Sequence, residues 1–418
     1  MLVINPKRSN ELADAKPHWY NYYAGYSHAF TQGVINSLDL ADNAIILDPW
    51  NGSGTTTLVS SMSGYRSFGV DLNPAMKVIA LAKQSTPSDV EDVASRTRKI
   101  RFNRKVDVDN DDPLFDWFDE SGVSVIRKIE AGILEGKIHS TTKDKIDSLL
   151  PVQCLMFTAL FNCVRETLSS FIPSNPTWIK KPKADSERVS LSWDNFRKNY
   201  ISHLNSMVQA VGQLTQVWDS SLSQLKIGSS SELPLPDKSV DLVITSPPYC
   251  TRIDYGVATY PELSIIAVGG RSEIDKIRRS LMGTTTVPKD KDALSDDFGA
   301  TCVKFLQSVQ LHPSKASETY YLKNFIQYFS AMSTSMGEIS RTLKVGAQLV
   351  CVVQDSFYKD IHCDLSQIII DMSENHKLKL LDKHHFESKQ NMANLNNRSK
   401  LYRAKTLAIE TVLIFERE

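Results

Sequence analysis

The chain has 418 residues, of which 41% are hydrophobic and 23% are charged, and its 48 Lys and Arg balance 48 Asp and Glu. This composition excludes a wholly disordered, collagen-like or coiled-coil protein, and the length predicts two or three domains. The zero net charge gives no global sign of a nucleic-acid partner, although local charged patches can still bind one. No Cys-x-x-Cys pair, signal peptide or long apolar run occurs, so we expect no metal site and a cytoplasmic location.

The N-terminal part of the chain has the pattern of an alternating β-α-β-α series. Residues 44–47 predict a buried strand that ends at Asp48, and a helix is expected over residues 55–62. A second predicted strand, residues 67–70, ends at Asp71 and is followed by a helix with a proline in its first turn. Strands that alternate with helices indicate a doubly wound sheet.

The middle of the chain, residues 91–225, predicts an α-helical insertion that could recognise DNA. It opens with a cationic run, residues 96–105, followed by an acidic run, residues 107–120. The cationic run would either follow a DNA backbone or pair with the acidic run behind it. A break near residue 175 places an aromatic side chain beside three cations, a combination that suits base and phosphate contact: Trp178, Lys180, Lys181 and Lys183.

Strand signals return at residues 240–245. The polar, turn-rich residues 266–320 predict a loop excursion with possible DNA contact. Further expected elements are helices over residues 321–343 and 366–372, and strands over residues 348–353 and 408–415. We therefore expect a core made of residues 1–90, 226–265 and 321–418, with the two insertions flanking a substrate cleft.

The first motif with chemical content is the segment Asp48-Pro49-Trp50-Asn51-Gly52-Ser53-Gly54-Thr55-Thr56. Glycines directly after a strand let the backbone approach a ligand, and the next helix presents free N–H groups there. The pattern is neither a dinucleotide Gly-x-Gly-x-x-Gly nor a Walker loop, and by itself it fits a plain turn equally well. Asp71, at the end of the second strand, could accept hydrogen bonds from two ribose hydroxyls.

The second motif is Ser246-Pro247-Pro248-Tyr249, at the end of a predicted strand. Two prolines fix φ and remove two N–H donors, so the segment offers acceptors beside an aromatic face. That arrangement suits a planar group that carries an amino N–H₂. The alternative is a proline turn with a tyrosine in the core.

Together the two motifs resemble those of the amino-directed DNA methyltransferases, which use S-adenosylmethionine. The first is similar to their cofactor motif, usually Asp-Pro-Phe-x-Gly-x-Gly-Thr-Thr, and the second to their catalytic motif. Residues 18–30 and 343–346 resemble two further family segments, and the ordered match covers roughly half the chain, outside both insertions. The chain departs from the family where Trp50 replaces Phe, Gly25 replaces Lys, and residues 228–230 replace an acid near the adenine amine.

The resemblance implies a class I methyltransferase fold of the α/β class, with a mostly parallel seven-stranded sheet and an antiparallel last strand. It also implies S-adenosylmethionine as the cofactor, and no metal. The implied cofactor-binding residues are Tyr26, Asp48, Pro49, Asn51, Gly52, Gly54, Thr55, Asp71 and Leu72. The implied catalytic residues, which would receive a base extruded from the duplex, are Ser246, Pro247, Pro248 and Tyr249. The expected DNA-contacting residues are Trp178, Lys180, Lys181 and Arg252.

The expected function is a site-specific methyltransferase for double-stranded DNA, working with restriction or defence proteins. Ser-Pro-Pro-Tyr favours cytosine N4, and adenine N6 stays open. Cytosine C5 chemistry uses a Pro-Cys nucleophile, and no Pro-Cys dipeptide occurs here. An RNA amino-methyltransferase and a binding module that has lost catalysis are the remaining alternatives.

Overall fold

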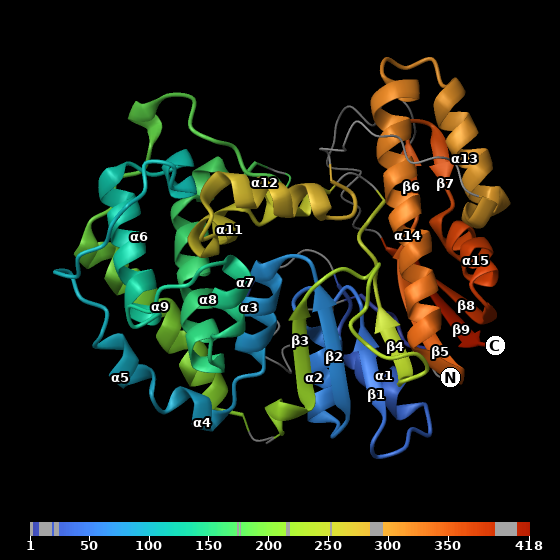
Figure 1. The fold of residues 1–418 in the computed structure, drawn as a ribbon, viewed down its shortest axis with the longest axis horizontal. Helices are drawn as coiled ribbons and strands as arrows, with labels where there is room; N and C mark the ends of the chain where they lie inside the picture. Colours follow the sequence, from blue (N-terminus) through green and yellow to red (C-terminus); the bar gives the residue numbers. More distant parts are fainter. Residues whose placement is uncertain are drawn as a thin grey trace.

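The computed structural model describes residues 3–7, 19–20, 25–173, 175, 177–214, 218–250, 253–284, 296–388 and 408–418. Its centre is a seven-stranded sheet in the order β3-β2-β1-β4-β5-β9-β8 (Figure 1). These strands are β1 (Ile45–Asp48), β2 (Arg66–Asp71), β3 (Ser223–Ile227), β4 (Val240–Thr245), β5 (Leu343–Gln354), β8 (Leu378–Ser388) and β9 (Ala408–Arg417). A separate small sheet pairs β6 (Ser356–Tyr358) with β7 (Ile361–Cys363).

The sheet confirms the predicted class I methyltransferase fold. Strands β1 to β5 pair in parallel, and β9 is antiparallel to both of its neighbours. Parallel strands buried on both faces are apolar along their length, and β1 and β4 follow this rule at the centre of the sheet. Because β1, β2 and β4 run in the same direction, their carboxyl ends meet at one edge, which is where such sheets bind ligands.

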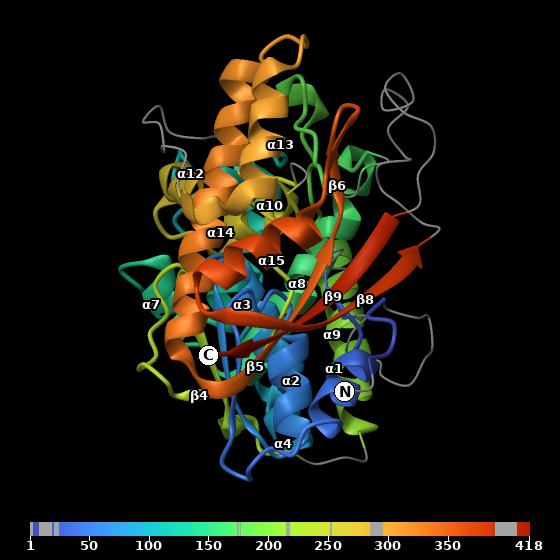
Figure 2. The same cartoon turned by 90° about the vertical axis from the view of Figure 1, so that its right-hand side faces the viewer.

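Helices cover both faces of the sheet (Figure 2). On one face, α1 (His28–Asn36) and α2 (Thr55–Met62) bury a cluster that includes Phe30 and Ile244. On the other face, α13 (Gly299–Leu311), α14 (Leu322–Thr342) and α15 (Leu365–Asn375) bury a larger cluster that includes Phe329 and Leu349. Each face is therefore sealed by helices, which leaves the strand ends as the place for a site.

The predicted helical insertion packs against α3 (Pro74–Lys83), a helix of the sheet domain. It contains α5 (Val93–Thr97), α6 (Glu120–Ile133), α7 (Thr142–Asp147), α8 (Pro151–Thr167) and α9 (Trp193–Gly212), after the short α4 (Pro87–Val90). Its apolar cluster also takes in Met76 and Ile79 from α3 and Leu263 from α11 (Tyr260–Ile266). The insertion and the sheet domain thus share one continuous set of buried side chains.

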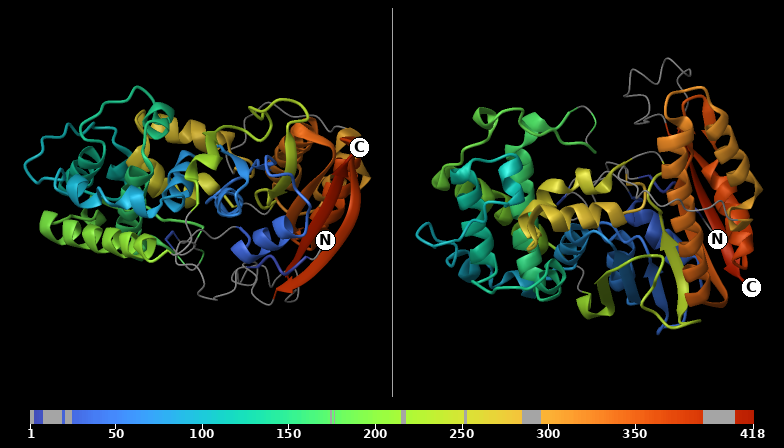
Figure 3. Two further views of the ribbon diagram at one scale, coloured as in Figure 1. Left: turned by 90° about the horizontal axis from the view of Figure 1, so that it is seen from below. Right: turned by 45° about the horizontal axis from the view of Figure 1, so that its top comes forward.

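The prediction of a loop excursion over residues 266–320 is wrong for much of its length. The described part contains α12 (Gly270–Ser280) and α13, which follow the short helices α10 (Tyr255–Ala258) and α11. Only Ile274 of α12 is buried. The sequence of α12 therefore lacks the repeating apolar residues that predict a helix. Helices α11 and α12 lie between the insertion and α14 (Figures 1 and 3). None of the described helices combines the length and apolarity needed to cross a membrane.

Candidate active site

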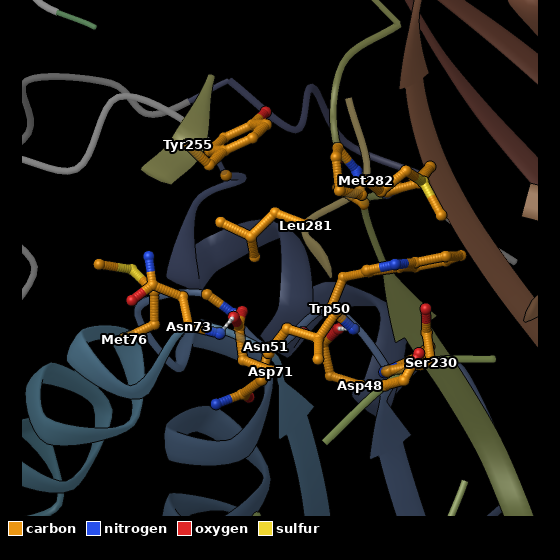
Figure 4. Close-up of a pocket in the computed structure, with 18 of the residues that line it drawn as sticks. Asp48, Trp50, Asn51, Asp71, Asn73, Met76, Ser230, Tyr255, Leu281 and Met282 are labelled. Carbon is orange, nitrogen blue, oxygen red and sulfur yellow. Dashed lines mark hydrogen bonds between the residues drawn. The ribbon is translucent and has the colours of Figure 1, made fainter. Parts of the chain in front are cut away.

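A pocket that opens to solvent lies at the carboxyl ends of β1, β2 and β4 (Figure 4). Two predicted groups of residues meet there. From the predicted cofactor set, the lining includes Tyr26, Asp48, Pro49, Asn51, Gly52, Thr55, Asp71 and Leu72. From the predicted catalytic set, it includes Ser246, Pro247, Pro248 and Tyr249. Motifs about 190 residues apart in the chain therefore face one cavity.

The turn after β1 is fixed to the end of β2 by hydrogen bonds. The Asn51 amide donates to the Val70 carbonyl at 3.0 Å, and the Gly52 amide donates to Asp71 Oδ2 at 2.8 Å. Gly52 has a φ of 47°, a left-handed conformation that glycine adopts easily. The glycine turn is thus set in place by the neighbouring strand.

Gly54 is not among the residues that line the pocket, and its role in binding the cofactor stays a prediction. It caps α2 with a φ of 82°, and a Cβ at this position would lie 2.7 Å from the Cβ of Ala80 in α3. Real Cβ atoms do not approach so closely, so a side chain would push α2 and α3 apart. The second glycine of the motif serves helix packing.

Asp48 ties three parts of the molecule together. Its Oδ1 accepts hydrogen bonds from Thr245 Oγ1 at 2.6 Å and from the Trp50 amide at 3.1 Å, and its Oδ2 accepts one from Tyr26 Oη at 3.1 Å. The side chain is almost fully buried, at 3% exposure, and this burial raises its pKa to about 6. Asp48 therefore joins β1 to β4 and anchors the N-terminal segment at the pocket wall.

Asp71 has carboxylate capacity left for a ligand. Its Oδ1 accepts a hydrogen bond from the Asn73 amide at 2.8 Å, while Oδ2 accepts the one from Gly52. Each carboxylate oxygen has two lone pairs, so both can accept a further bond. Burial raises the pKa of this carboxyl to about 6. The group is held by two backbone amides and faces the cavity.

Serine hydroxyls that follow β3 line the pocket on the side of Asp71. Gly228 and Ser229 to Ser231 line it, and the Gly228 amide donates to the Asp71 carbonyl at 3.1 Å. Ser230 Oγ lies 2.8 Å from Ser335 Oγ of α14. Where the family often has an acid, this chain therefore presents small hydroxyl groups, in keeping with the departure noted in the sequence.

The Ser-Pro-Pro-Tyr segment is held from both sides. Tyr328 Oη, in α14, donates to the Pro248 carbonyl at 2.7 Å, and the Tyr249 amide donates to Tyr255 Oη at 3.1 Å. Within the described residues, the Ser246 hydroxyl and the Pro247 carbonyl make no hydrogen bond. These two acceptors line the pocket and remain available to a ligand.

Most of the wall facing the cofactor motif was not foreseen from the sequence, although a place at the pocket rim was one expectation for residues 251–255, which follow the catalytic motif. It contains Tyr255, Thr259, Leu281 and Met282, and α14 adds Ala331. Figure 4 shows Tyr255, Leu281 and Met282 across the cavity from Asp48 and Asp71. Asn73 and Met76, at the start of α3, were also missed; Asn73 Nδ2 donates to Thr259 Oγ1 at 2.7 Å. The one signal that could have found Asn73 was its position two residues after the acid that ends β2.

Three of the predicted DNA-contacting residues, Trp178, Lys180 and Lys181, do not line this pocket. Trp178 is 44% exposed, and Lys180 is exposed as well. Lys181 forms an ion pair with Asp116 at 2.6 Å, and its Nζ lies 4.8 Å from the ring centre of Tyr260. Arg252 falls outside the described residues.

The expected pairing of the cationic run with the acidic run is corrected by the structure. Arg96 pairs with Asp92 and Glu135, and Lys99 also pairs with Glu135. The acids behind the run have other partners: Asp112 pairs with Arg127, and both Asp111 and Asp116 pair with Arg271. The ion pairs formed by the two runs therefore join them to other parts of the chain and not to each other.

Known proteins with similar sequences carry a common description. The chain is 25% identical over 303 residues to the type II methyltransferase M.BsoBI of Geobacillus stearothermophilus, covering 66% of this chain and 57% of that protein. It is 23% identical over 388 residues to the type II methyltransferase M.AvaI of Nostoc sp., covering 85% and 77%. Both relatives are described as type II methyltransferases, and the chain spans a little over half the length of M.BsoBI.

Other comparisons with this chain are more distant. No protein-family model matches it. Among solved structures, it is similar to a SAM-dependent methyltransferase of Methanosarcina mazei, with 11% identity, 92% of this chain and 96% of the other covered, and a TM-score of 0.31.

The sequence resemblance implies S-adenosylmethionine as the cofactor, and the polar groups of the pocket fit it. Asp71 retains acceptor capacity for a ribose diol, and the Gly52 turn brings backbone close to the cavity. Apolar side chains of Leu72 and Met76 line the same side and suit the faces of a purine.

Proposed function

We propose that this chain transfers a methyl group from S-adenosylmethionine to an exocyclic amine of a base in double-stranded DNA, with cytosine N4 as the target. The observation that carries the proposal is the meeting of the two motifs in one pocket. The Asp71 side has free carboxylate capacity, and the Ser246 side has two unengaged acceptors beside Tyr249. A donor of methyl groups and an amine could therefore be held face to face.

The proposed roles follow from the chemistry of each group. Asp71 would accept hydrogen bonds from the ribose, and the turn at Asn51 and Gly52 would border the methionine part. When bound, the cofactor supplies a methyl group already activated on its sulfonium. Asp48 contributes by holding the strand ends together through Thr245 and Tyr26, so that the two halves of the pocket keep their spacing.

On the base side, Ser246 and Pro247 would accept hydrogen bonds from the amine. The amine lone pair is delocalised into the base ring, and acceptors at these two positions favour the pyramidal geometry needed for attack. Tyr249 would stack on the extruded base, since a base within the duplex cannot reach an enclosed methyl donor. Alignment of two reactants in one cavity supplies much of the catalysis.

The choice of cytosine N4 rests on the Ser-Pro-Pro-Tyr form of the motif, which resembles that of cytosine-N4 enzymes. Pairing with a restriction or defence protein is proposed from the description of M.BsoBI and M.AvaI as type II methyltransferases.

The test is mass spectrometry of digested DNA after incubation with isotopically labelled cofactor. We expect N4-methylcytosine. Tyr249→Ala should lower methyl transfer by about 5- to 150-fold, because stacking contributes roughly 1–3 kcal/mol per base. Tyr249→Phe keeps the ring and should retain most of the activity, and both variants should bind cofactor as the unmodified chain does.

The other outcomes separate the alternatives. N6-methyladenine would overturn the base assignment and leave the reaction class standing. Label in RNA and never in DNA would overturn the substrate. No transfer to any nucleic acid, across many sequences, would overturn the enzymatic proposal.

A further inference from the structure

The peptide group between Pro248 and Tyr249 is hydrogen-bonded at both of its ends. Its carbonyl oxygen accepts from Tyr328 Oη at 2.7 Å, and its N–H donates to Tyr255 Oη at 3.1 Å. A peptide group is planar, so these two hydrogen bonds hold one rigid group at its two opposite edges. The bonded atoms belong to the backbone that carries the Tyr249 ring.

The two contacts remove the rotational freedom that this peptide has left. The pyrrolidine ring of Pro248 already fixes its φ. The peptide group could still rotate about ψ of Pro248 and φ of Tyr249, and such a rotation would break both hydrogen bonds. The direction of the Tyr249 ring depends on the same two torsions.

The two tyrosines are themselves held rigidly, by different parts of the fold. Tyr328 belongs to α14, is 1% exposed and packs edge-on against Phe329, with ring centres 5.2 Å apart. Tyr255 is the first residue of α10, where Asp254 accepts a hydrogen bond from the Val257 amide at 3.0 Å and caps the helix. Neither hydroxyl needs to move to meet the peptide.

Helix α10 is in turn fixed to α12. The Asp254 carboxylate forms an ion pair with Arg278 at 2.7 Å, and the side chain of Asp254 is buried. A Cβ on Gly256 would lie 2.7 Å from Cγ of Arg278, so the two helices are in close contact. The end of α12 leads into Leu281 and Met282, which line the same pocket.

We propose that Tyr255 and Tyr328 are positioning residues, which fix the Pro248–Tyr249 peptide and thereby aim the Tyr249 ring and the Pro247 carbonyl at the base. The catalytic part of this inference rests on the proposed function. The structural part does not, because the peptide and its two partners are defined without any substrate.

The first measurement concerns the peptide alone. Pro247 and Pro248 have no N–H, so the Tyr249 amide is an isolated reporter, and its hydrogen exchange can be followed by NMR with ¹⁵N-tyrosine. Tyr255→Phe and Tyr328→Phe should each raise its exchange rate by roughly two- to tenfold, as expected for one lost hydrogen bond. The matched control is Tyr358→Phe, which removes a buried hydroxyl bonded to Ser317 at 2.6 Å, outside the pocket.

The second measurement is steady-state methyl transfer to DNA. Each of the two variants should lower kcat by roughly two- to tenfold, with KM for DNA and Kd for the cofactor unchanged. The double variant should lose less than the product of the single losses, since both bonds hold one peptide. Tyr358→Phe should keep the kcat of the unmodified chain, and all variants should melt within the range set by this control.

Two results would overturn the proposal. Unchanged exchange of the Tyr249 amide in both variants would show that the hydroxyls do not fix the peptide. Faster exchange with an unchanged kcat would remove the catalytic role. If the unmodified chain transfers no methyl group to any nucleic acid, the proposed function fails, and the exchange measurement still decides the structural part.

Discussion

The two sides of the pocket are built in different ways. Most of the cofactor side comes from one stretch, residues 48–76, in which the strand ends, the turn and the helix start bond to each other, and Tyr26 and residues 228–231 complete it. The base side takes four residues from the end of β4 and the rest from α10, the end of α12 and α14. One side is local in sequence, whereas the other is assembled by tertiary packing.

This difference indicates which changes each side tolerates. On the cofactor side, a substitution acts on a compact network whose members are close in sequence, so its effect should appear in stability and in cofactor affinity together. On the base side, the segment proposed to meet the base depends on distant partners, such as Tyr328, which lies 80 residues from Pro248 in the chain. Substitutions there should alter turnover before they alter cofactor affinity.

The largest expected effect comes from Gly54→Ala, which tests how tightly the cofactor side is packed. The new Cβ would meet Ala80 at 2.7 Å and force a φ of 82° on an L-residue. The left-handed conformation costs about 1–2 kcal/mol, and overpacking about 1–3 kcal/mol more. Chemical denaturation should therefore show a loss of about 2–5 kcal/mol in the free energy of unfolding.

Gly64→Ala provides the matched control for this change. Gly64 has a φ of 84°, and a Cβ there would meet nothing within 4 Å. The control should lose only the conformational part, about 1–2 kcal/mol. Equal losses in the two variants would mean that the contact with α3 contributes nothing.

A smaller effect is expected at Asp71, which separates cofactor affinity from folding. Asp71→Ala should weaken cofactor binding by about 1.5–3 kcal/mol, the usual contribution of hydrogen bonds to a charged group. Titration calorimetry measures this. Unchanged affinity in a folded variant would contradict the assignment of Asp71 to the ribose.

The raised pKa of Asp71 adds a pH dependence with a definite sign. Burial raises this pKa from 3.8 to about 6, so the carboxylate loses its charge as the pH falls through about 6. Cofactor affinity should therefore decrease from pH 7 to pH 5, and Asp71→Asn should flatten this dependence. For folding, the native state binds the extra proton, so this group's contribution to stability decreases as the pH rises from about 4 to about 6.

The smallest effect is expected from the lysines of the helical insertion, which would extend the base side towards DNA. Replacing Lys180, Lys181 and Lys183 with Ala should flatten the log–log salt dependence of DNA binding by up to about three, at about 0.9 per phosphate contact. Lys181 should contribute least, because Asp116 already pairs with it.

The control for the lysine variant removes three exposed lysines elsewhere: Lys226, Lys304 and Lys379. Fluorescence anisotropy at several salt concentrations gives the slopes. Equal slopes for both triple variants would assign the insertion cluster to ordinary solvated surface.

The fold was predictable where the strands are buried on both faces. Apolar runs identified β1, β2, β4, β5 and β9. Strand β3, at one edge of the sheet, was missed because only Leu225 among its residues is buried, so its sequence lacks an apolar run. Strand β8, at the other edge, was missed as well, and its sequence is polar along much of its length.

The candidate site was predictable where residues follow a strand directly. Asp48, Asp71 and Ser246 are such residues, since position at the carboxyl end of a parallel strand places a side chain at the ligand edge. Tyr255, Met282 and Ala331 could not be found in this way. Their place depends on how α10, α12 and α14 pack, and packing across long loops leaves no mark on a local sequence pattern.

The shared core of the insertion has a consequence for engineering. Residues 91–225 bury Met76 and Ile79 of α3, and α3 begins at the pocket with Asn73. Deleting the segment would expose the apolar face of α3 and destabilise this wall of the pocket. Replacing it with a different segment would require the whole α3–α8 contact to be redesigned. Substitutions intended to change DNA recognition should therefore be made on the outer surface of the insertion, and the face that contacts α3 should be left unchanged.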